Sequence, residues 1–172
     1  MILQLAAEPK KASRVPIRQK EPQPFLREEG ATPAAIEPPS TLGAGRRILV
    51  VDDNPVVLKA FESKLKNNGF EVATVSNANL VASTADKLKA ELIILDINFP
   101  TSSGPDWTGF TILQWLRRFP ELGSIPVIMI TGEQSPQYKE KALAAGAAGF
   151  FQKPVPYPEL LTEMLRLVPR PA

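Results

Sequence analysis

The sequence predicts a doubly wound α/β domain, and three observations support this prediction. After Arg46, short apolar runs rich in β-branched residues alternate with longer segments of helical periodicity. The runs are continuously apolar, which is typical of parallel strands covered on both faces. The chain is 172 residues long and 44% hydrophobic, enough to bury a substantial core. We therefore expect a parallel sheet with helices on each side.

Five strands and five helices are predicted, in strict alternation. The strands are expected at Ile48–Val51, Phe70–Val75, Leu92–Leu95, Val127–Ile130 and Ala148–Phe151. The segments long enough for helices of about three turns are Pro55–Asn68, Asn79–Lys89, Thr108–Phe119, Ser135–Ala145 and Pro156–Val168. Local signals support these boundaries. Asn54 is a good N-cap before Pro55, and Gly69 and Gly146 occupy positions that favour helix termination.

Residues 1–45 have a different composition from the rest of the chain. They mix charged residues with seven prolines and contain little apolar sequence, which predicts a disordered tail before a domain at residues 46–172. The tail is interpreted first as a solvated extension and second as a tether or docking segment. Its first seven residues are too short an apolar stretch for a secretory signal.

Composition excludes several classes of function. The chain has no cysteine, which excludes disulfides and thiolate metal sites, and no long apolar run. A cytoplasmic protein without membrane insertion is therefore expected. A net charge of +2 without a clustered basic patch gives no indication of direct nucleic-acid binding. The absence of histidine excludes a phosphohistidine or a histidine base, so any chemistry depends on carboxylates, hydroxyls and amines.

Polar residues follow the predicted strands where ligands bind in open parallel sheets. Asp52 and Asp53 follow the first strand, Asp96 the third, Thr131 the fourth and Lys153 the fifth. Three carboxylates at one edge repel one another unless a cation lies among them. Mg²⁺, or Mn²⁺ in its place, suits such oxygen ligands.

Asp96 is the predicted nucleophile because it ends the central strand. The other two acids are expected on one side of it, and Thr131 and Lys153 on the other. An aspartyl oxygen that attacks phosphorus forms a labile acyl phosphate. Lys153 and Thr131 would then balance the negative charge of the transferred group.

Four motifs, in order, resemble the receiver domain of response regulators in two-component signalling, over residues 46–168. They are the segments 48–54 (ILVVDDN), 95–100 (LDINFP), 127–132 (VIMITG) and 144–154 (AAGAAGFFQKP). The resemblance implies a flavodoxin-like sheet of strand order 2-1-3-4-5. It also implies a bacterial phosphorylation-switched signalling domain of the single-domain type, which assists its own phosphorylation and dephosphorylation without being a conventional enzyme.

The resemblance also implies a role for each site residue. Asp96 would be the phosphoacceptor, and Asp53 would bind the metal directly while Asp52 binds it chiefly through water. The main-chain carbonyl of Asn98 would complete the metal site. Lys153 would contact the phosphoryl group, with a cis peptide bond to Pro154.

Switching and partners are implied in the same way. Thr131 would move toward the phosphoryl group while Phe150 turns inward, which would alter the surface of residues 135–145, 148–151 and 156–168 for a downstream protein. The phosphoryl group would come from a sensor histidine kinase or a phosphotransfer protein.

The sequence departs from the usual receiver pattern in a few places. Residues 101–105 lengthen the loop beside the site, and Phe150 replaces the more usual tyrosine. No output domain is expected after residue 172. Asn98 and Glu133 lie two residues beyond Asp96 and Thr131, at positions that influence acyl-phosphate hydrolysis in the family. The pair is similar to that of chemotaxis-type regulators and suggests a short-lived signal.

Two alternatives are open. A pseudo-receiver scaffold would apply if the 101–105 loop occludes Asp96. A haloacid-dehalogenase-like phosphatase would also use an aspartyl nucleophile. That family, however, places its nucleophile after the first strand with a second aspartate two residues on, where this sequence has Asn54.

Overall fold

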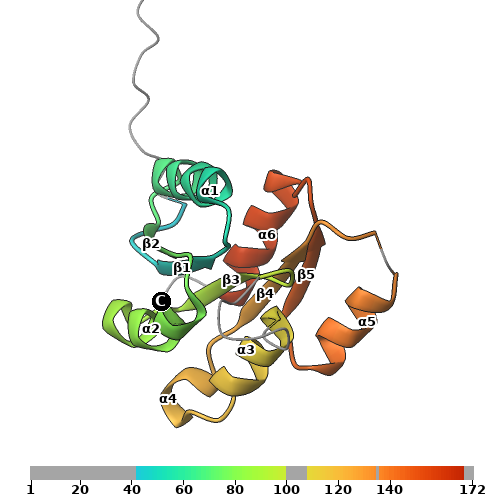
Figure 1. Cartoon of the computed structure of the whole chain (residues 1–172). Coiled ribbons are helices and arrows are strands. Elements are labelled where there is room, and N and C mark those ends of the chain that lie inside the picture. Colours follow the sequence, from blue (N-terminus) through green and yellow to red (C-terminus); the bar gives the residue numbers. More distant parts are fainter. Residues whose placement is uncertain (1–41, 100–107, 135, 169–172) are drawn as a thin grey trace, which may run out of the picture. The chain divides into compact units, whose positions relative to one another are not determined.

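The computed structural model describes residues 42–99, 108–134 and 136–168. Its five strands form one parallel sheet in the order β2-β1-β3-β4-β5 (Figure 1). They are β1 (Arg47–Val51), β2 (Glu71–Val75), β3 (Leu92–Asp96), β4 (Val127–Thr131) and β5 (Gly149–Gln152). The predicted doubly wound fold and strand order are confirmed.

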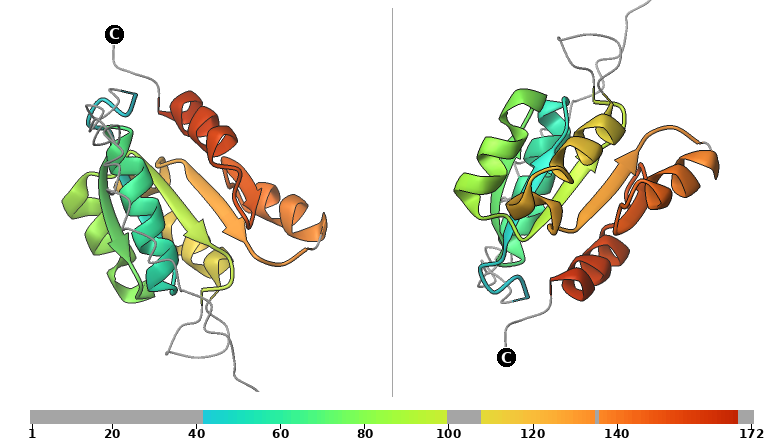
Figure 2. Two further views of the ribbon diagram at one scale, coloured as in Figure 1. Left: turned by 90° about the horizontal axis from the view of Figure 1, so that it is seen from above. Right: turned by 90° about the horizontal axis from the view of Figure 1, so that it is seen from below.

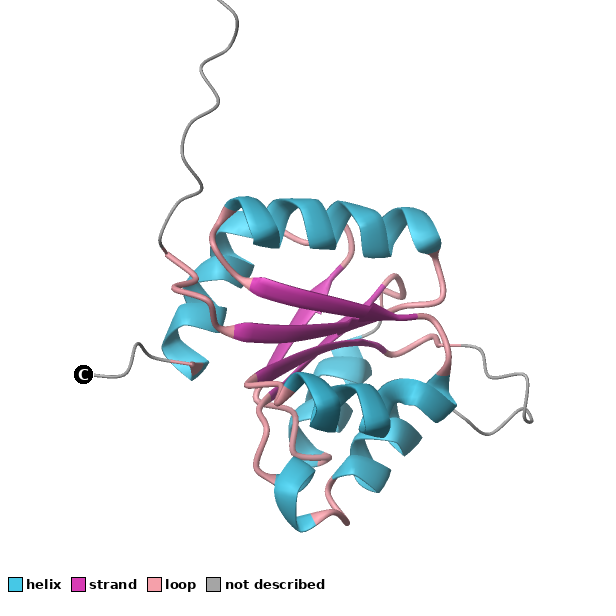
Figure 3. Ribbon diagram, turned by 90° about the vertical axis from the view of Figure 1, so that its left-hand side faces the viewer, coloured by secondary structure: helices cyan, strands magenta, loops and turns pink. Residues whose placement is uncertain are grey.

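Helices cover both faces of the sheet, as the continuous apolar runs predicted. They are α1 (Pro55–Asn67), α2 (Val81–Leu88), α3 (Gly109–Leu116), α4 (Pro120–Gly123), α5 (Pro136–Ala144) and α6 (Tyr157–Leu167), with a 3₁₀ turn η1 (Ala78–Leu80) before α2. Helices α1 and α6 pack on one face, and α2, α3 and α4 lie across the other (Figures 2 and 3).

Alternating side chains of each central strand enter two separate cores. In β1, Ile48 and Val50 face the α1–α6 side, whereas Leu49 and Val51 face the opposite side. All four side chains are fully buried. Full burial of such a side chain stabilises a protein by about 1.5–3 kcal/mol. A shift of the strand by one residue would move every side chain into the wrong core, so the two cores fix the strand register. The register in turn fixes where each strand ends.

The predicted helix signals act as expected. The Asn54 side chain accepts a hydrogen bond from the Val56 N–H at 2.9 Å and caps α1. Gly69 and Gly146 follow α1 and α5 with φ of +83° and +89°, a backbone conformation that favours glycine.

Two predicted helices differ in form from the structure. The segment Asn79–Lys89 begins as the 3₁₀ turn η1, because the Asn77 side chain accepts from the Asn79 N–H and opens the turn there. The predicted helix Thr108–Phe119 is shorter in the structure, where α3 ends at Leu116, and the short helix α4, which was not predicted, begins after it at Pro120. The cause is Pro120, since the residue before a proline avoids the helical conformation and Phe119 is extended, with ψ of 125°.

The predicted tail and the inserted loop lie largely outside the described part of the chain. Of residues 1–45, only 42–45 are described. The Gly43 and Gly45 N–H groups donate to the carbonyls of Asn68 and Gly69 at 2.7 and 2.9 Å. The 101–105 loop is not among the described residues. No helix in the described ranges has the length and apolarity needed to cross a membrane.

Candidate functional site

The carboxyl ends of β1, β3, β4 and β5 lie along one edge of the sheet. Strand order reverses direction at β1 and β3, so this edge contains the topological switch point where open α/β sheets bind ligands. Asp96 and Thr131 end β3 and β4, Asp52 directly follows β1, and Lys153 directly follows β5. The fold therefore brings together the side chains that the sequence placed at separate strand ends.

The three aspartates form one acidic cluster. Asp52, Asp53 and Asp96 each present a carboxylate oxygen, and these three oxygens lie within 4.8 Å of one another. Asp52 and Asp96 are buried, at 0% and 3% exposure, whereas Asp53 is exposed. Burial makes the mutual repulsion costly, because little solvent screens the two inner charges.

Lys153 balances part of this charge. Its Nζ lies 2.7 Å from Asp52 Oδ2 and 3.2 Å from Asp96 Oδ2. Burial lowers the pKa of Lys153, but Asp52 and Asp96 outweigh this effect, so the net pKa is raised and the side chain stays cationic. The peptide bond to Pro154 is cis, as the resemblance implied.

The two buried aspartates differ in how completely they are satisfied. Asp52 Oδ1 accepts the Asn54 N–H at 2.9 Å, and its Oδ2 accepts from Lys153. Asp96 Oδ1 is buried without a hydrogen-bond partner in the described structure. Burial raises the pKa of Asp96, Lys153 opposes this, and the nearby charge of Asp52 raises it further. Asp96 thus carries the unsatisfied oxygen of the cluster.

This arrangement fits a hard divalent cation. Three carboxylates whose oxygens lie within 4.8 Å of one another carry more negative charge than the single ammonium of Lys153 balances, which favours a further cation. Carboxylate oxygens at this spacing are the ligands that Mg²⁺ prefers. The acidic cluster is therefore of the metal-binding kind.

Thr131 supplies a buried hydroxyl on the other side of Asp96. It is fully buried, and its Oγ1 accepts the Glu133 N–H at 3.1 Å, which leaves the hydroxyl proton free to be donated elsewhere. Its carbonyl accepts the Lys153 N–H at 2.7 Å. This hydrogen bond connects the end of β4, which carries the Thr131 hydroxyl, to the segment that carries the Lys153 ammonium.

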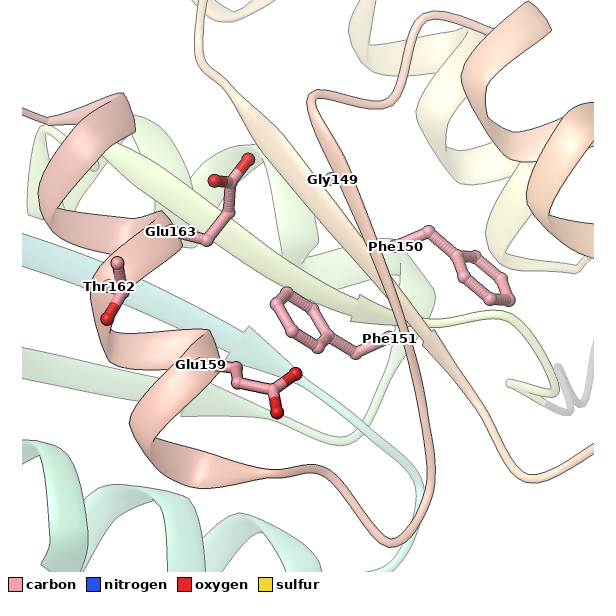
Figure 4. A pocket seen from close by; sticks show the side chains of 6 residues that line it. All are labelled: Gly149, Phe150, Phe151, Glu159, Thr162 and Glu163. Carbon is pink, nitrogen blue, oxygen red and sulfur yellow. The ribbon is translucent and has the colours of Figure 1, made fainter.

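Phe150 lies on β5. Neighbouring side chains of a strand point to opposite faces, and Figure 4 shows Phe150 and Phe151 on opposite sides of β5. Phe150 is half-buried against the core on the side of α2, α3, α4 and α5, and Phe151 is half-buried against the core on the side of α1 and α6. A cavity of about 320 Å³ lies between β5 and α6, lined by Gly149, Phe150, Phe151, Glu159, Thr162 and Glu163.

Sequence reasoning did not assign a role to Gly109. Its N–H donates to the Ile97 carbonyl at 2.9 Å, and a Cβ at this position would collide with the backbone carbonyl oxygen of Asp96. Only glycine lets the start of α3 approach the end of β3 so closely. The glycine was visible in the sequence, but the requirement arises from a backbone contact that the sequence does not display.

The fold and site together define an aspartyl phosphoacceptor domain of a signalling protein. The protein-family model for the response regulator receiver domain matches residues 48–165. The chain therefore belongs to the response regulator receiver family. This assignment removes the dehalogenase-like alternative, and it describes a signalling domain rather than a conventional enzyme.

Individual relatives agree with this assignment. The chain is 32% identical over 126 residues to the transcriptional regulatory protein GltR of Pseudomonas aeruginosa, covering 73% of this chain and 50% of that protein. It is 34% identical over 127 residues to the response regulator protein TmoT of Ectopseudomonas mendocina, covering 72% and 54%. The chain spans about half the length of these curated relatives.

A solved structure shares the fold. The chemotaxis response regulator CheY4 of Vibrio cholerae superposes with a TM-score of 0.63 and 29% identity, covering 72% of this chain and 99% of that one.

Proposed function

We propose that Asp96 accepts a phosphoryl group from a sensor histidine kinase, a phosphotransfer protein or a small phosphodonor. The observation that carries this assignment is the buried Asp96 Oδ1, which has no partner although Lys153 holds the other oxygen of the same carboxylate. A carboxylate fixed in this way presents one oxygen for attack. In the transfer, that oxygen forms a bond to phosphorus while the bond from phosphorus to the donor breaks.

Lys153 and Thr131 are the groups proposed to receive the transferred negative charge. Lys153 Nζ already lies 3.2 Å from Asp96, so it can move its contact to a phosphoryl oxygen over a short distance. The Thr131 hydroxyl can donate to a second phosphoryl oxygen. Preorganised donors of this kind stabilise a transfer without reorganising when it occurs.

The metal ligands are proposed from the same cluster. Asp53, Asp96 and the main-chain carbonyl of Asn98 would hold Mg²⁺, or Mn²⁺ in its place, and Asp52 would bind it through water. Such an ion neutralises charge between the acids and the phosphoryl oxygens. Asp52 suits the indirect role because both of its oxygens already accept hydrogen bonds.

The output is proposed to be a change of protein-binding surface. Thr131 would move toward the phosphoryl group and Phe150 inward, altering the face formed by α5, β5 and α6. The half-buried position of Phe150 supports this role, because the ring has one side against the core and one side outside it. The cavity beside β5 lies on the same face.

The test is the intact mass of the full chain after incubation with acetyl phosphate and Mg²⁺. We expect one labile phosphoryl adduct, absent from the Asp96→Asn variant and absent when EDTA is added. Asp86→Asn is a matched control, since Asp86 is an exposed aspartate on α2, and it should be phosphorylated like the wild type. Failure to form an adduct, even with rapid quenching and with beryllofluoride binding as a second readout, would favour the pseudo-receiver scaffold.

A further inference from the structure

A second cavity lies along α1, on the side that faces the segment between β5 and α6. Its volume is about 280 Å³, and its wall is formed by one face of α1 and by residues that lead from Lys153 into α6. Most of the lining side chains are apolar or aromatic, and these are Val57, Ala60, Phe61, Pro154, Val155 and Tyr157. An apolar cavity with an aromatic wall is the kind of surface that proline-rich chain segments bind.

The charged groups in the wall of this cavity are cationic. Among the described residues, the wall contains Lys64 and Lys153 and no carboxylate. Lys153 is already paired with Asp52 and Asp96. Lys64 Nζ lies 5.3 Å from the centroid of the Tyr157 ring, and no carboxylate in the described ranges forms an ion pair with it. The cavity therefore favours an occupant that carries a carboxylate.

The first described residues of the chain are held beside one end of this cavity. The Gly43 N–H donates to the Asn68 carbonyl at 2.7 Å, and Asn68 Nδ2 donates to the Tyr157 hydroxyl at 3.0 Å. The Leu42 carbonyl accepts from Arg46 Nη1 at 3.3 Å, so the backbone is fixed at the first described residue as well. The residues that precede Leu42 therefore start close to a side chain of the cavity wall.

The five residues before Leu42 match the cavity in composition and in reach. Residues 37–41 (EPPST) contain two prolines, one carboxylate and no cation. In the polyproline II conformation, which prolines favour, five residues span about 15 Å. The face of α1 from Val57 to Asn68 has a similar length, roughly 16 Å at the rise of an α-helix. The segment is therefore long enough to lie in the cavity while it stays joined to Leu42.

We propose that residues 37–41 bind in this cavity, with Pro38 and Pro39 against its apolar wall and the Glu37 carboxylate beside Lys64. Of the two interpretations of the tail, this one makes its last part a docking segment. Because Lys153 lines the cavity, the bound segment lies next to a residue of the proposed phosphorylation site. The binding itself needs no phosphoryl group, since all the groups that form it belong to the unmodified chain.

The experiment measures disulfide formation between two introduced cysteines in the full chain, which has no cysteine of its own. Ser40→Cys places one thiol in the segment, and Ala60→Cys places the other in the cavity wall. In the matched control, Lys59→Cys replaces Ala60→Cys, since Lys59 is the preceding residue of α1, has a 79% exposed side chain and does not line the cavity. Under a mild oxidant, we expect the Ala60 pair to form an intramolecular disulfide on the order of tenfold faster, because binding raises the effective concentration of its thiols.

A charge exchange tests the proposed pairing of Glu37 with Lys64. In the Ser40→Cys, Ala60→Cys protein, Glu37→Lys should slow disulfide formation about two- to fivefold, as expected when an exposed ion pair is replaced by two like charges. Adding Lys64→Glu should restore the rate, because the two opposite charges are then exchanged. Lys87→Glu, an equal change of net charge at an exposed residue of α2, should not restore it.

Three outcomes would overturn the inference. Equal rates for the Ala60 and Lys59 pairs would show that the segment does not bind in the cavity. A disulfide that forms mainly between two chains would assign the cavity to a second copy of the protein. Restoration by Lys87→Glu as complete as that by Lys64→Glu would leave only net charge as the cause. Phosphorylation of Asp96 enters none of these measurements, so failure of the proposed function is recognised separately.

Discussion

Two cationic side chains, Lys153 and Arg117, lie near opposite ends of the strands, and they bond groups of different kinds. Lys153, at the carboxyl ends of the strands, contacts the charged oxygens of Asp52 and Asp96. Arg117, before the amino ends of β4 and β5, donates only to neutral backbone carbonyls. Those carbonyls belong to Gly123, Ile125 and Gly146, each at 2.9 Å.

The electrostatic consequences are opposite. Burial lowers the pKa of Arg117, with no acid to oppose it, whereas two carboxylates raise that of Lys153 against its own burial. Arg117 satisfies three backbone carbonyls that precede β4 and β5. The Lys153 edge leaves Asp96 Oδ1 without a partner and more negative charge than one lysine balances. We therefore assign a structural role to the Arg117 end of the strands and the proposed chemistry to the Lys153 end.

The largest expected effect is on chemistry at the Lys153 edge. We predict that Lys153→Ala slows phosphorylation by acetyl phosphate about 10²–10³-fold, as loss of a preorganised charge-stabilising donor does elsewhere. The measurement is the initial rate of adduct formation by intact mass. Lys66→Ala, which removes an exposed lysine paired with Glu62, is the control and should react at the wild-type rate. A near-normal rate in Lys153→Ala would break the assignment of this edge to chemistry.

The next effect is on stability at the Arg117 edge. Arg117→Ala removes the donors of three backbone carbonyls, and we expect the free energy of unfolding to fall by about 2–3 kcal/mol. Arg117→Lys should recover little of this, because an ammonium cannot replace the planar fork of donors. Urea unfolding provides the measurement, with the exposed neighbour Arg118→Ala as control.

This second prediction also sharpens the comparison. At a temperature where Arg117→Ala remains folded, its rate of phosphorylation should match that of the wild type. A large loss of phosphorylation in the folded variant would mean that the two edges are coupled rather than divided.

The smallest effect concerns the charge of Asp96 in metal-free protein. Burial raises the pKa of this carboxyl, so the folded protein holds its proton more tightly than the unfolded chain does. In EDTA, the free energy of unfolding should therefore decrease as pH rises from the ordinary aspartate range through the raised pKa. Asp96→Asn should lack this contribution and be more stable at neutral pH by on the order of 1 kcal/mol.

Urea titrations at several pH values would measure this difference. Adding Mg²⁺ should stabilise the wild type more than Asp96→Asn, because a ligand stabilises the state that binds it. Equal pH dependence in the two proteins would show that Asp96 carries no excess charge cost in the fold.

Much of the architecture could be predicted because local sequence determines it. Runs such as Leu92–Leu95 are too continuously apolar to stand at a surface, and Asn54 and Gly69 set helix boundaries through their own backbone preferences. The predicted third helix was ended at Phe119, before Pro120, whereas the four-residue helix α4 that begins at Pro120 was not predicted.

The sequence predicted which residues meet at the site. Parallel strands place their carboxyl ends at one edge, so the residues after each run had to meet there whatever the details of packing. The roles assigned to those members, including Asn98 and Phe150, stay predictions until phosphorylation is measured.

The sequence by itself determined which chemical groups reach the site, because strand periodicity and strand order are encoded by neighbouring residues. Only the tertiary structure decided how those groups share their bonds. It paired Asp52 with Lys153 and the Asn54 amide, and it left Asp96 Oδ1 without a partner in the described structure. The physical reason is that hydrogen bonds and burial depend on distances between segments remote in the chain, and no local pattern records those distances.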